Sequence, residues 1–385
     1  MNCVADVRSD RCEIWAPTQV PGSAQRLAAE ITGLSPAAIT VHMIRAGGGF
    51  GRRLMADYAA EAVLLSKAVS APAQVVWSRE DDMRHDYYRP AGLHRLRAGI
   101  DAEGNLVAWH VHTATTSRYQ FRMDSEPAET TEVFPDAIPA GLVPNFRLAY
   151  SPADTGVPTG AWRGPGKNSN TFVDQCFLDE VAHAAGADPV AFRRRLLGEA
   201  RDMPYRDHGG PTYNTGRLKT VLEVAATKSN WGGRLPGSQG RGVAAHFMFG
   251  AYVAQVAEVT VDRQNGEVRV DRIVAAVDCG IVINPTGARA QLEGGIIHGL
   301  SATLHGEITI AEGGAVPGNF DQYPLLRIGE TPDIEVHFVA STEHPQGLGE
   351  MALPSVAPAV GNAIFAATGK RVRRLPIRPR DLGEG

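Results

Sequence analysis

The feature that most limits the possible folds is a run of three strand-like segments, at residues 242–248, 253–261 and 268–277. Asn265 and Gly266 separate the last two segments, and this dipeptide is a strong signal for a hairpin between antiparallel strands. A helix-like segment follows from Pro285 to Leu304. Hairpins mixed with helices, without a regular alternation of strand and helix, predict a fold of the α+β class.

The remaining segments mix helical and alternating spacing in the same way. Helices are predicted at residues 22–34, 56–69, 170–185, 189–197 and 218–228, and strands at residues 38–45, 73–77, 93–100, 106–114 and 334–339. Residues 117–166 follow neither pattern, which is typical of a segment that crosses between domains or lines a cavity. Because 385 residues exceed the usual size of one domain, we expect two α+β lobes, at residues 1–145 and 146–385.

Charge and cysteine content exclude several classes of protein. The formal net charge is −4, and basic residues cluster only at Arg193–Arg195 and in residues 370–380, so we expect no nucleic-acid partner. No apolar run approaches the length of about 18 residues that a membrane span requires. The four cysteines are dispersed, whereas iron–sulfur clusters need grouped thiolates. The twelve histidines are dispersed as well, so a metal site built from protein ligands is not expected.

Glu350 is an acid in unusual surroundings. It lies in PQGLGEMALPSVAP, residues 345–358, after two glycines and before an apolar Met-Ala-Leu. Apolar surroundings disfavour the charged form of a carboxylate and raise its pKa, which makes it a useful base near neutral pH. The alternative is a solvent-facing turn glutamate, since Glu is rarely buried without a partner.

Two glycine-rich loops are candidates for ligand binding. GGGFGRR, residues 47–53, follows a predicted strand and precedes a predicted helix, where close backbone approach and free N–H groups favour an anion. GAWRGPGKNSN places Trp162 and Arg163 between flexible residues, and an arginine suits a phosphate or a polar ring. Gln291 lies in the second turn of the helix that follows VDCGIVINP. Taken alone, GGGFGRR is equally consistent with a tight turn, and the other two signals favour an ordinary loop and a surface residue.

Taken in order, GGGFGRR, AWRGPG, DCGIVINP, QLEGG and GLGE resemble motifs of the molybdopterin-binding large subunit of the xanthine dehydrogenase (molybdenum hydroxylase) family. VWSREDDMRHDYYRP and FAATGKRVRRLP also resemble the branch of the isoquinoline 1-oxidoreductase beta subunit, which is of the aldehyde dehydrogenase type. The resemblance extends over nearly the whole chain and implies a two-lobed molybdenum-cofactor-binding fold. It further implies hydroxylation of an aldehyde or N-heteroaromatic carbon with oxygen taken from water.

The resemblance also implies roles for individual residues. Glu350 is expected to be the catalytic base, which takes a proton from the water-derived oxygen as that oxygen attacks an electron-poor carbon. The expected cofactor is molybdenum–molybdopterin in its cytosine dinucleotide form, whose pterin dithiolene holds the metal, so no side chain is expected as a metal ligand. The residues implied to contact this cofactor are Gly48, Gly49, Phe50, Gly51, Arg52, Trp162, Arg163, Gln291 and Gly349.

Two departures from the family pattern limit these implications. Xanthine-oxidising members have an aromatic residue at the position of Pro165, so a purine substrate is not expected. Members of the branch are also substantially longer, and the GQG-type motif of their N-terminal half has no counterpart in this sequence. We therefore expect the chain to be a C-terminal half, either of a truncated gene product or of a large subunit split into two chains.

The resemblance implies several partners beside a small-molecule substrate. These are a small subunit with two [2Fe–2S] clusters, then a cytochrome c subunit, and a separate polypeptide that supplies the N-terminal half. The sequence leaves open whether the compartment is a bacterial periplasm or cytoplasm. Two other functions stay open: a non-catalytic remnant that does not retain the cofactor alone, and a phosphate- or nucleotide-binding protein that uses only the GGGFG loop.

Overall fold

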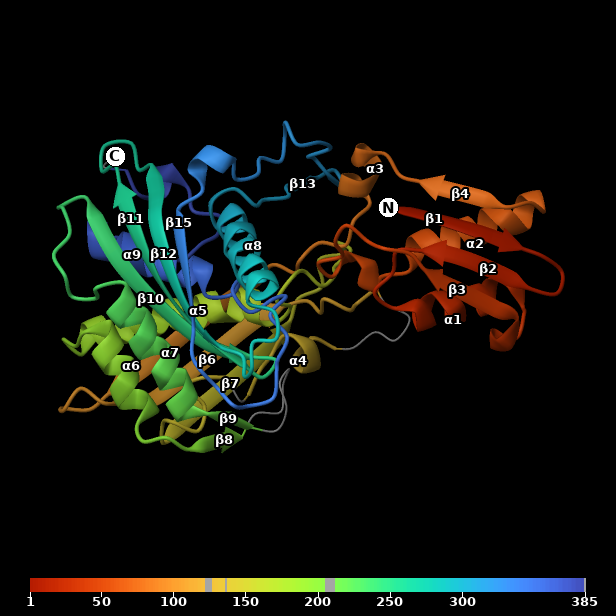
Figure 1. The fold of residues 1–385 in the computed structure, drawn as a ribbon. Coiled ribbons are helices and arrows are strands. Elements are labelled where there is room, and N and C mark those ends of the chain that lie inside the picture. The colour runs from red at the N-terminus through yellow and green to blue at the C-terminus, as the bar shows by residue number, and fades with distance from the viewer. Residues whose placement is uncertain (122–126, 136, 205–211, 384–385) are drawn as a thin grey trace.

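The computed structural model describes residues 1–121, 127–135, 137–204 and 212–383. Figure 1 shows a smaller N-terminal body beside a larger one, joined by extended segments. None of the described helices is long and apolar enough to cross a membrane. Helices and mixed sheets occur in both bodies, so the predicted α+β class is confirmed.

The N-terminal body is a four-stranded sheet covered on one face by two helices. Its strands are β1 (Asn2–Val7), β2 (Cys12–Ala16), β3 (Ile39–Met43) and β4 (Ala73–Val76), in the order β3-β2-β1-β4. Buried residues alternate along β1 and β2, and this period-two pattern turns one face of the sheet towards α1 (Pro21–Thr32) and α2 (Asp57–Val69). The loop from β3 to α2 leaves this body towards the larger one.

The larger body is built on a second four-stranded sheet. It contains β10 (Gln239–Met248), β11 (Ala251–Val261), β12 (Val268–Asp278) and β15 (Asp333–Phe338), antiparallel except for the β12–β15 pair. Of these strands, β10, β11 and part of β12 are buried on both faces. α7 (Thr215–Lys228) packs in the core on one face. α8 (Pro285–Leu304) and α9 (Val356–Thr368) pack in the core on the other. Burial on both faces explains the continuous apolar runs in β11 and in the second half of β12, whereas the edge strand β15 is only partly buried.

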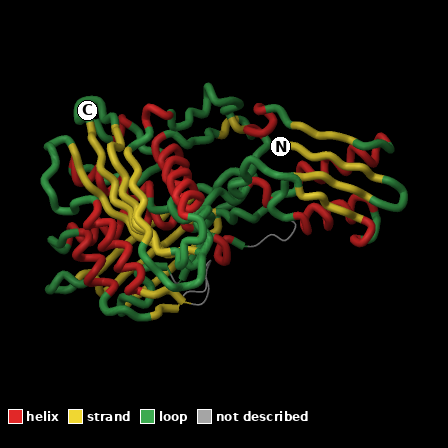
Figure 2. The backbone as a smooth tube through the Cα atoms, viewed as in Figure 1, coloured by secondary structure: helices red, strands yellow, loops and turns green. Residues whose placement is uncertain are grey.

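A third sheet and its helices complete the larger body. β5 (Gly92–Ile100), β6 (Leu106–Thr115) and β7 (Asn145–Pro152) pack against α5 (Lys167–Ala184) and α6 (Pro189–Leu197) around Trp109. Figure 2 shows these strands beneath the main sheet. The shorter elements are α3 (Arg79–Arg84), α4 (Ala128–Thr131), β8 (Asp202–Pro204), β9 (Thr212–Asn214), β13 (Ile310–Ala311), β14 (Gly314–Ala315) and four 3-10 turns at residues 36–38, 52–54, 328–330 and 379–381.

Several elements were not predicted from the sequence, and β7, α3 and α9 are the three that change the picture of the loops. β7 lies inside the stretch expected to be irregular, part of which falls outside the described residues. α3 lies in the charged segment after β4, where Ser78 and Asp81 form a capping box. α9 starts at Val356, so Pro358 lies in a helical turn and the Glu350 loop is shorter than the Pro345–Pro358 segment suggested. The division into lobes after residue 145 stays a prediction.

α9 lies so close to β10 that two strand glycines have no room for a side chain. A Cβ added to Gly240 or Gly242 would fall on backbone atoms of α9. Because α9 directly follows the Glu350 loop, this close contact fixes the end of that loop against the sheet.

We predict that Gly242→Ala lowers the free energy of unfolding by about 1–3 kcal/mol, because an added methyl group overpacks a rigid backbone contact. Gly237→Ala is the matched control, since nothing lies within 4 Å of a Cβ at that position. Denaturant unfolding of the two variants measures the difference. Equal stability of the two variants would contradict the contact between α9 and β10.

Candidate functional site

Four segments that are distant in the sequence meet around Arg163. They are the loop after β3, the loop before α5, helix α8 and the loop before α9. Figure 1 shows the last three in the larger body, with the loop after β3 reaching them from the smaller one. Arg163 is only 6% exposed although it carries a charge, so its partners decide what it can do.

Arg163 links the helix that carries Gln291 to the loop that carries Glu350. Its Nε donates to the carbonyl oxygen of Gly349 at 2.6 Å, and its Nη2 donates to the carbonyl oxygen of Gln291 at 3.1 Å. The side-chain Oε1 of Gln291 is a further, longer acceptor at 3.4 Å. Burial lowers the pKa of Arg163, and the charge of Glu350 acts in the opposite direction.

Glu350 is held through one oxygen. The backbone N–H of Gly164 donates to Glu350 Oε1 at 2.9 Å, and the side chain is half-buried. The apolar residues that follow it, Met351 and Ala352, are buried in the core. The carbonyl of Ala352 accepts a bond at 2.7 Å from Nε2 of Gln255, which is fully buried in β11. The sheet therefore fixes the loop on which Glu350 stands.

Asn168 at the start of α5 fixes the other side of the site. Its Nδ2 donates to the carbonyl oxygens of Trp162 and Arg163 at 3.2 and 3.3 Å. Its Oδ1 accepts from Arg89 Nε at 2.8 Å. Asn168 is buried, so these bonds form where water competes little.

The glycine loop contacts the Trp162 loop directly. A Cβ on Gly51, whose φ is +102°, would fall on the carbonyl oxygen of Ala161. Gly51 N–H also donates to Gln19 Oε1 at 3.2 Å. Phe50 has a φ of +49°, which is strained for a bulky residue, and the residue is 51% exposed. Glycine is thus required here for the approach of two protein loops, in addition to any approach by a ligand.

The glycine loop does not lead straight into a helix. A 3-10 turn at Arg52–Leu54 separates it from α2, which begins at Asp57. The glycines therefore do not adjoin the N-terminal turn of α2. An anion site that combines the glycine loop with the free N–H groups of this helix start is excluded.

Arg52 lies in a different cluster from Arg163. Its guanidinium forms a bidentate pair with Asp57, at 2.9 and 2.8 Å, and a second ion pair with Asp86. It also lies over the ring of Tyr87, 5.0 Å from the centroid. Burial raises the pKa of Asp86 to about 6, against the opposing effect of Arg52. Of the residues named from the sequence, Arg52 is the one whose charge is already matched by two carboxylates.

The structure adds His298, which the sequence did not single out. Trp162 Nε1 donates to His298 Nε2 at 3.2 Å, and the two rings meet edge to face. The ring of Phe50 meets the same histidine edge to face, with centroids 5.1 Å apart. Burial, helped by nearby Arg163, lowers the pKa of His298 to about 4. Its position seven residues after Gln291 places both on one face of α8, and that spacing is the signal that could have found it.

Phe50, Gly51, Trp162, Arg163, Gln291, Gly349 and Glu350 are thus brought together in one site. Gly48 and Gly49 flank it in the same loop, where added Cβ atoms would meet the Phe50 ring and Gln19. Among the described residues, no group of three or more His, Cys, Asp or Glu side chains could hold a metal ion.

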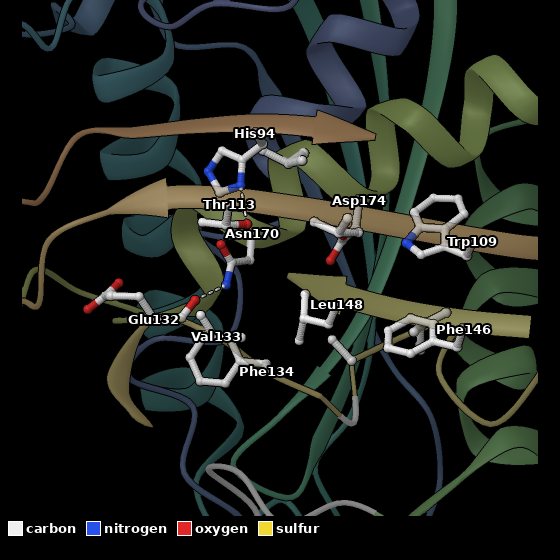
Figure 3. Close-up of a pocket in the computed structure, with 14 residues that line it drawn as sticks. His94, Trp109, Thr113, Glu132, Val133, Phe134, Phe146, Leu148, Asn170 and Asp174 are labelled. Carbon is white, nitrogen blue, oxygen red and sulfur yellow. Dashed lines mark hydrogen bonds between the residues drawn. The ribbon is translucent and has the colours of Figure 1, made fainter. Parts of the chain in front are cut away.

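A cavity of about 30 Å³ lies apart from this site, between α5 and the β5–β6–β7 sheet (Figure 3). His94 Nδ1 bonds to Thr113 Oγ1 there at 3.0 Å, and Asn170 donates to the carbonyl of Glu132. The cavity holds only about two water molecules by volume. None of the residues predicted for the site lines it.

A second cavity of similar size is also lined by Asp174 and reaches His246 in β10. His246 is 5% exposed. Burial lowers the pKa of His246 to about 3, nearby Lys167 acts in the same direction, and the backbone of Met351 opposes them. Burial raises the pKa of Asp174 to about 7. His246 is therefore neutral near pH 7, and neither of its buried ring nitrogens has a hydrogen-bond partner among the described residues.

Two protein-family models match the chain. Residues 1–197 match one family model described as a molybdopterin cofactor-binding domain, and residues 197–332 match a second with that description. The chain is 32% identical to the beta subunit of isoquinoline 1-oxidoreductase from Brevundimonas diminuta, over 95% of this chain and 46% of that protein. The chain belongs to the molybdopterin-binding molybdenum hydroxylase family.

Two further relatives extend this comparison. The chain is 35% identical to a membrane-bound aldehyde dehydrogenase [pyrroloquinoline-quinone] of Gluconacetobacter polyoxogenes, over 88% of this chain and 46% of that protein. It is 30% identical to one of the subunits of nicotinate dehydrogenase from Pseudomonas putida, over 97% of this chain and 32% of that protein. The chain therefore spans about half the length, or less, of these curated relatives.

The solved structures support the fold. Quinoline 2-oxidoreductase from Pseudomonas putida 86 superposes with a TM-score of 0.82 at 15% identity, over 99% of this chain and 73% of that one. The aldehyde oxidoreductase from Desulfovibrio gigas superposes with a TM-score of 0.81 at 16% identity, over 99% of this chain and 58% of that one. The predicted two-lobed molybdenum-cofactor-binding fold is thus confirmed.

We predict that buried His246 makes stability depend on pH. The unfolded chain binds a proton at this histidine near pH 6.5, whereas the folded chain binds it only near pH 3, so stability falls as the pH drops from 7. Between pH 7 and 5 the wild-type protein should lose about 2 kcal/mol more than His246→Gln. Denaturant unfolding at several pH values measures this loss.

The same titration series contains its own control. Above pH 7 the histidine is neutral in both states, so the wild-type and His246→Gln curves should differ by a constant. Parallel curves down to pH 5 would show that His246 is accessible to protons in the folded protein.

Proposed function

We propose that this chain is the cofactor-binding and catalytic part of a molybdenum-dependent oxidoreductase that hydroxylates an aldehyde or an N-heteroaromatic carbon. The observation that carries the proposal is the meeting of Arg163, Gln291 and the Glu350 loop at one place. The phosphate-binding alternative requires only the glycine loop and gives no reason for this arrangement. Relatives named as an aldehyde dehydrogenase, an isoquinoline oxidoreductase and a nicotinate dehydrogenase support the substrate class.

The residues present fit a pterin cofactor with a phosphate group. The site offers a buried guanidinium, an exposed amide side chain at Gln291 and exposed glycine backbone at Gly48 and Gly349. Guanidinium and amide groups suit the phosphate and the polar ring edges of such a cofactor. We assign the cofactor-contacting role to Gly48, Gly49, Phe50, Gly51, Trp162, Arg163, Gln291 and Gly349. Arg52 belongs to the same loop but acts by holding that loop against Asp57 and Asp86.

Glu350 is proposed as the general base. One of its oxygens is fixed by Gly164 N–H, which orients the carboxylate and leaves the second oxygen to accept a proton. Glu350 takes that proton from the water-derived oxygen that is added to the substrate carbon. The C–H bond of the substrate breaks in the same step, and the cofactor, when bound, would supply the redox centre that takes up this hydrogen together with its two electrons.

The electrons must then leave the chain. The four cysteines of the sequence, Cys3, Cys12, Cys176 and Cys279, are free and buried, and they are not grouped as cluster ligands. We therefore propose that a separate [2Fe–2S] subunit accepts the electrons and passes them to a cytochrome c subunit. We further propose the cytosine dinucleotide form of the cofactor.

The first experiment is the molybdenum content of the chain, purified alone and again after co-expression with its genomic neighbours. About one molybdenum per chain in either preparation is the expected result. Pyrroloquinoline quinone should be assayed on the same samples, because the name of one relative contains that cofactor. The absence of both molybdenum and quinone from both preparations would favour the non-catalytic remnant.

We predict that Glu350→Gln keeps the molybdenum content and lowers turnover about 10²–10⁴-fold, because the amide cannot accept the proton. Glu343→Gln is the matched control, since Glu343 is an exposed acid in the same segment before α9. Both variants are assayed with an aldehyde or heterocycle and an artificial electron acceptor. Loss of molybdenum in parallel with turnover would instead give Glu350 a structural role.

A further inference from the structure

We propose that His298 is a positioning residue, whose neutral imidazole holds the Trp162 loop and the Phe50 loop at a fixed separation for the cofactor. The inference rests on the proposed function, because it concerns the residues assigned to cofactor contact. It goes further by giving a role to a residue of α8 that the sequence motifs do not mark.

The hydrogen bond to Trp162 decides the protonation state of His298. An indole N–H can only donate, so Nε2 of His298 must accept and therefore carries no proton. The single ring proton is then on Nδ1, and the imidazole is neutral. Arg163 is adjacent to Trp162 and already positive, so a second cation here would be repelled.

The two ring contacts connect loops from different bodies of the protein. Trp162 and Phe50 each meet the His298 ring edge to face, with interplanar angles of 85° and 76°. Such contacts prefer a narrow range of geometry, so one histidine ring constrains both aromatic rings. The Arg163 guanidinium lies 5.4 Å from the Phe50 ring centroid, so its position depends on the same arrangement.

His298 lies on a different face of α8 from the residues that pack in the core, so its positioning role is distinct from core packing. The residues of α8 that are buried against the sheet are Leu292, Ile296 and Leu300. His298 lies off that face and is half-buried, as expected for a side chain directed at surface loops. Replacing it should therefore disturb the site without opening a cavity in the core.

Two substitutions separate the functions of the ring and the acceptor. His298→Phe keeps an aromatic ring and removes the acceptor, which leaves the Trp162 N–H without its partner. His298→Gln keeps an acceptor oxygen of similar reach. His305→Gln, at the C-terminal end of the same helix, is the matched control outside the site.

The readouts are molybdenum per chain in the co-expressed protein, the denaturant midpoint of unfolding, and the emission of Trp162. The last is obtained by subtracting the spectrum of Trp162→Phe from that of the parent. We expect His298→Phe to lower molybdenum content about tenfold and to shift the Trp162 emission, with little change in the midpoint. His298→Gln should retain most of the molybdenum, and His305→Gln should match the wild type.

Two results would overturn the proposal. Full molybdenum content and an unchanged Trp162 emission in His298→Phe would show that the histidine positions nothing. Equal losses of molybdenum in the Phe and Gln variants, together with a lowered midpoint, would make it a general packing residue. If the wild-type protein itself lacks molybdenum, the proposed function fails, and the Trp162 emission alone then decides whether His298 holds the loop.

Discussion

The buried guanidinium of Arg163 is the interaction on which the rest of the site depends. An ionised group away from water is costly unless its hydrogen-bonding capacity is used, and the carbonyl oxygens of Gly349 and Gln291 supply acceptors at 2.6 and 3.1 Å. Meeting this requirement brings the loop of Glu350 against helix α8. Because both acceptors are backbone carbonyls, the arrangement fixes the path of the chain as well as the position of side chains.

The core of the larger body holds these elements in place. The β10–β11–β12–β15 sheet is covered by α7 on one face and by α8 and α9 on the other, so the helices that carry or follow site residues rest on a rigid layer. Gly240 and Gly242 bring α9 onto the backbone of β10, and Gln255 holds the carbonyl of Ala352. The site is thus formed by short loops at the ends of well-packed elements, which is where catalytic groups commonly lie.

The glycine loop shows how one motif can serve two physical purposes. The missing Cβ of Gly51 makes room for the carbonyl of Ala161, and this approach places the exposed Phe50 ring beside Arg163 and His298. Arg52, two residues beyond Phe50, turns away to Asp57 and Asp86. Two nearby residues of one motif therefore face different partners, and sequence order alone could not separate their roles.

The sequence by itself determined the α+β class, the hairpin at Asn265–Gly266, the helix that carries Gln291, and a set of ordered motifs that identify the family. These features are local, because they depend on spacing, turn chemistry and short motifs. The sequence missed α9, whose Pro358 and Gly361 resemble helix breakers and whose apolar residues show no single face. Only the tertiary structure decided that Arg163 is buried between Gly349 and Gln291, that Arg52 is paired elsewhere, and that His298 contacts Trp162 and Phe50. Those contacts of Arg163 and His298 join residues more than 100 positions apart, and the packing that brings them together has no signature within any one segment.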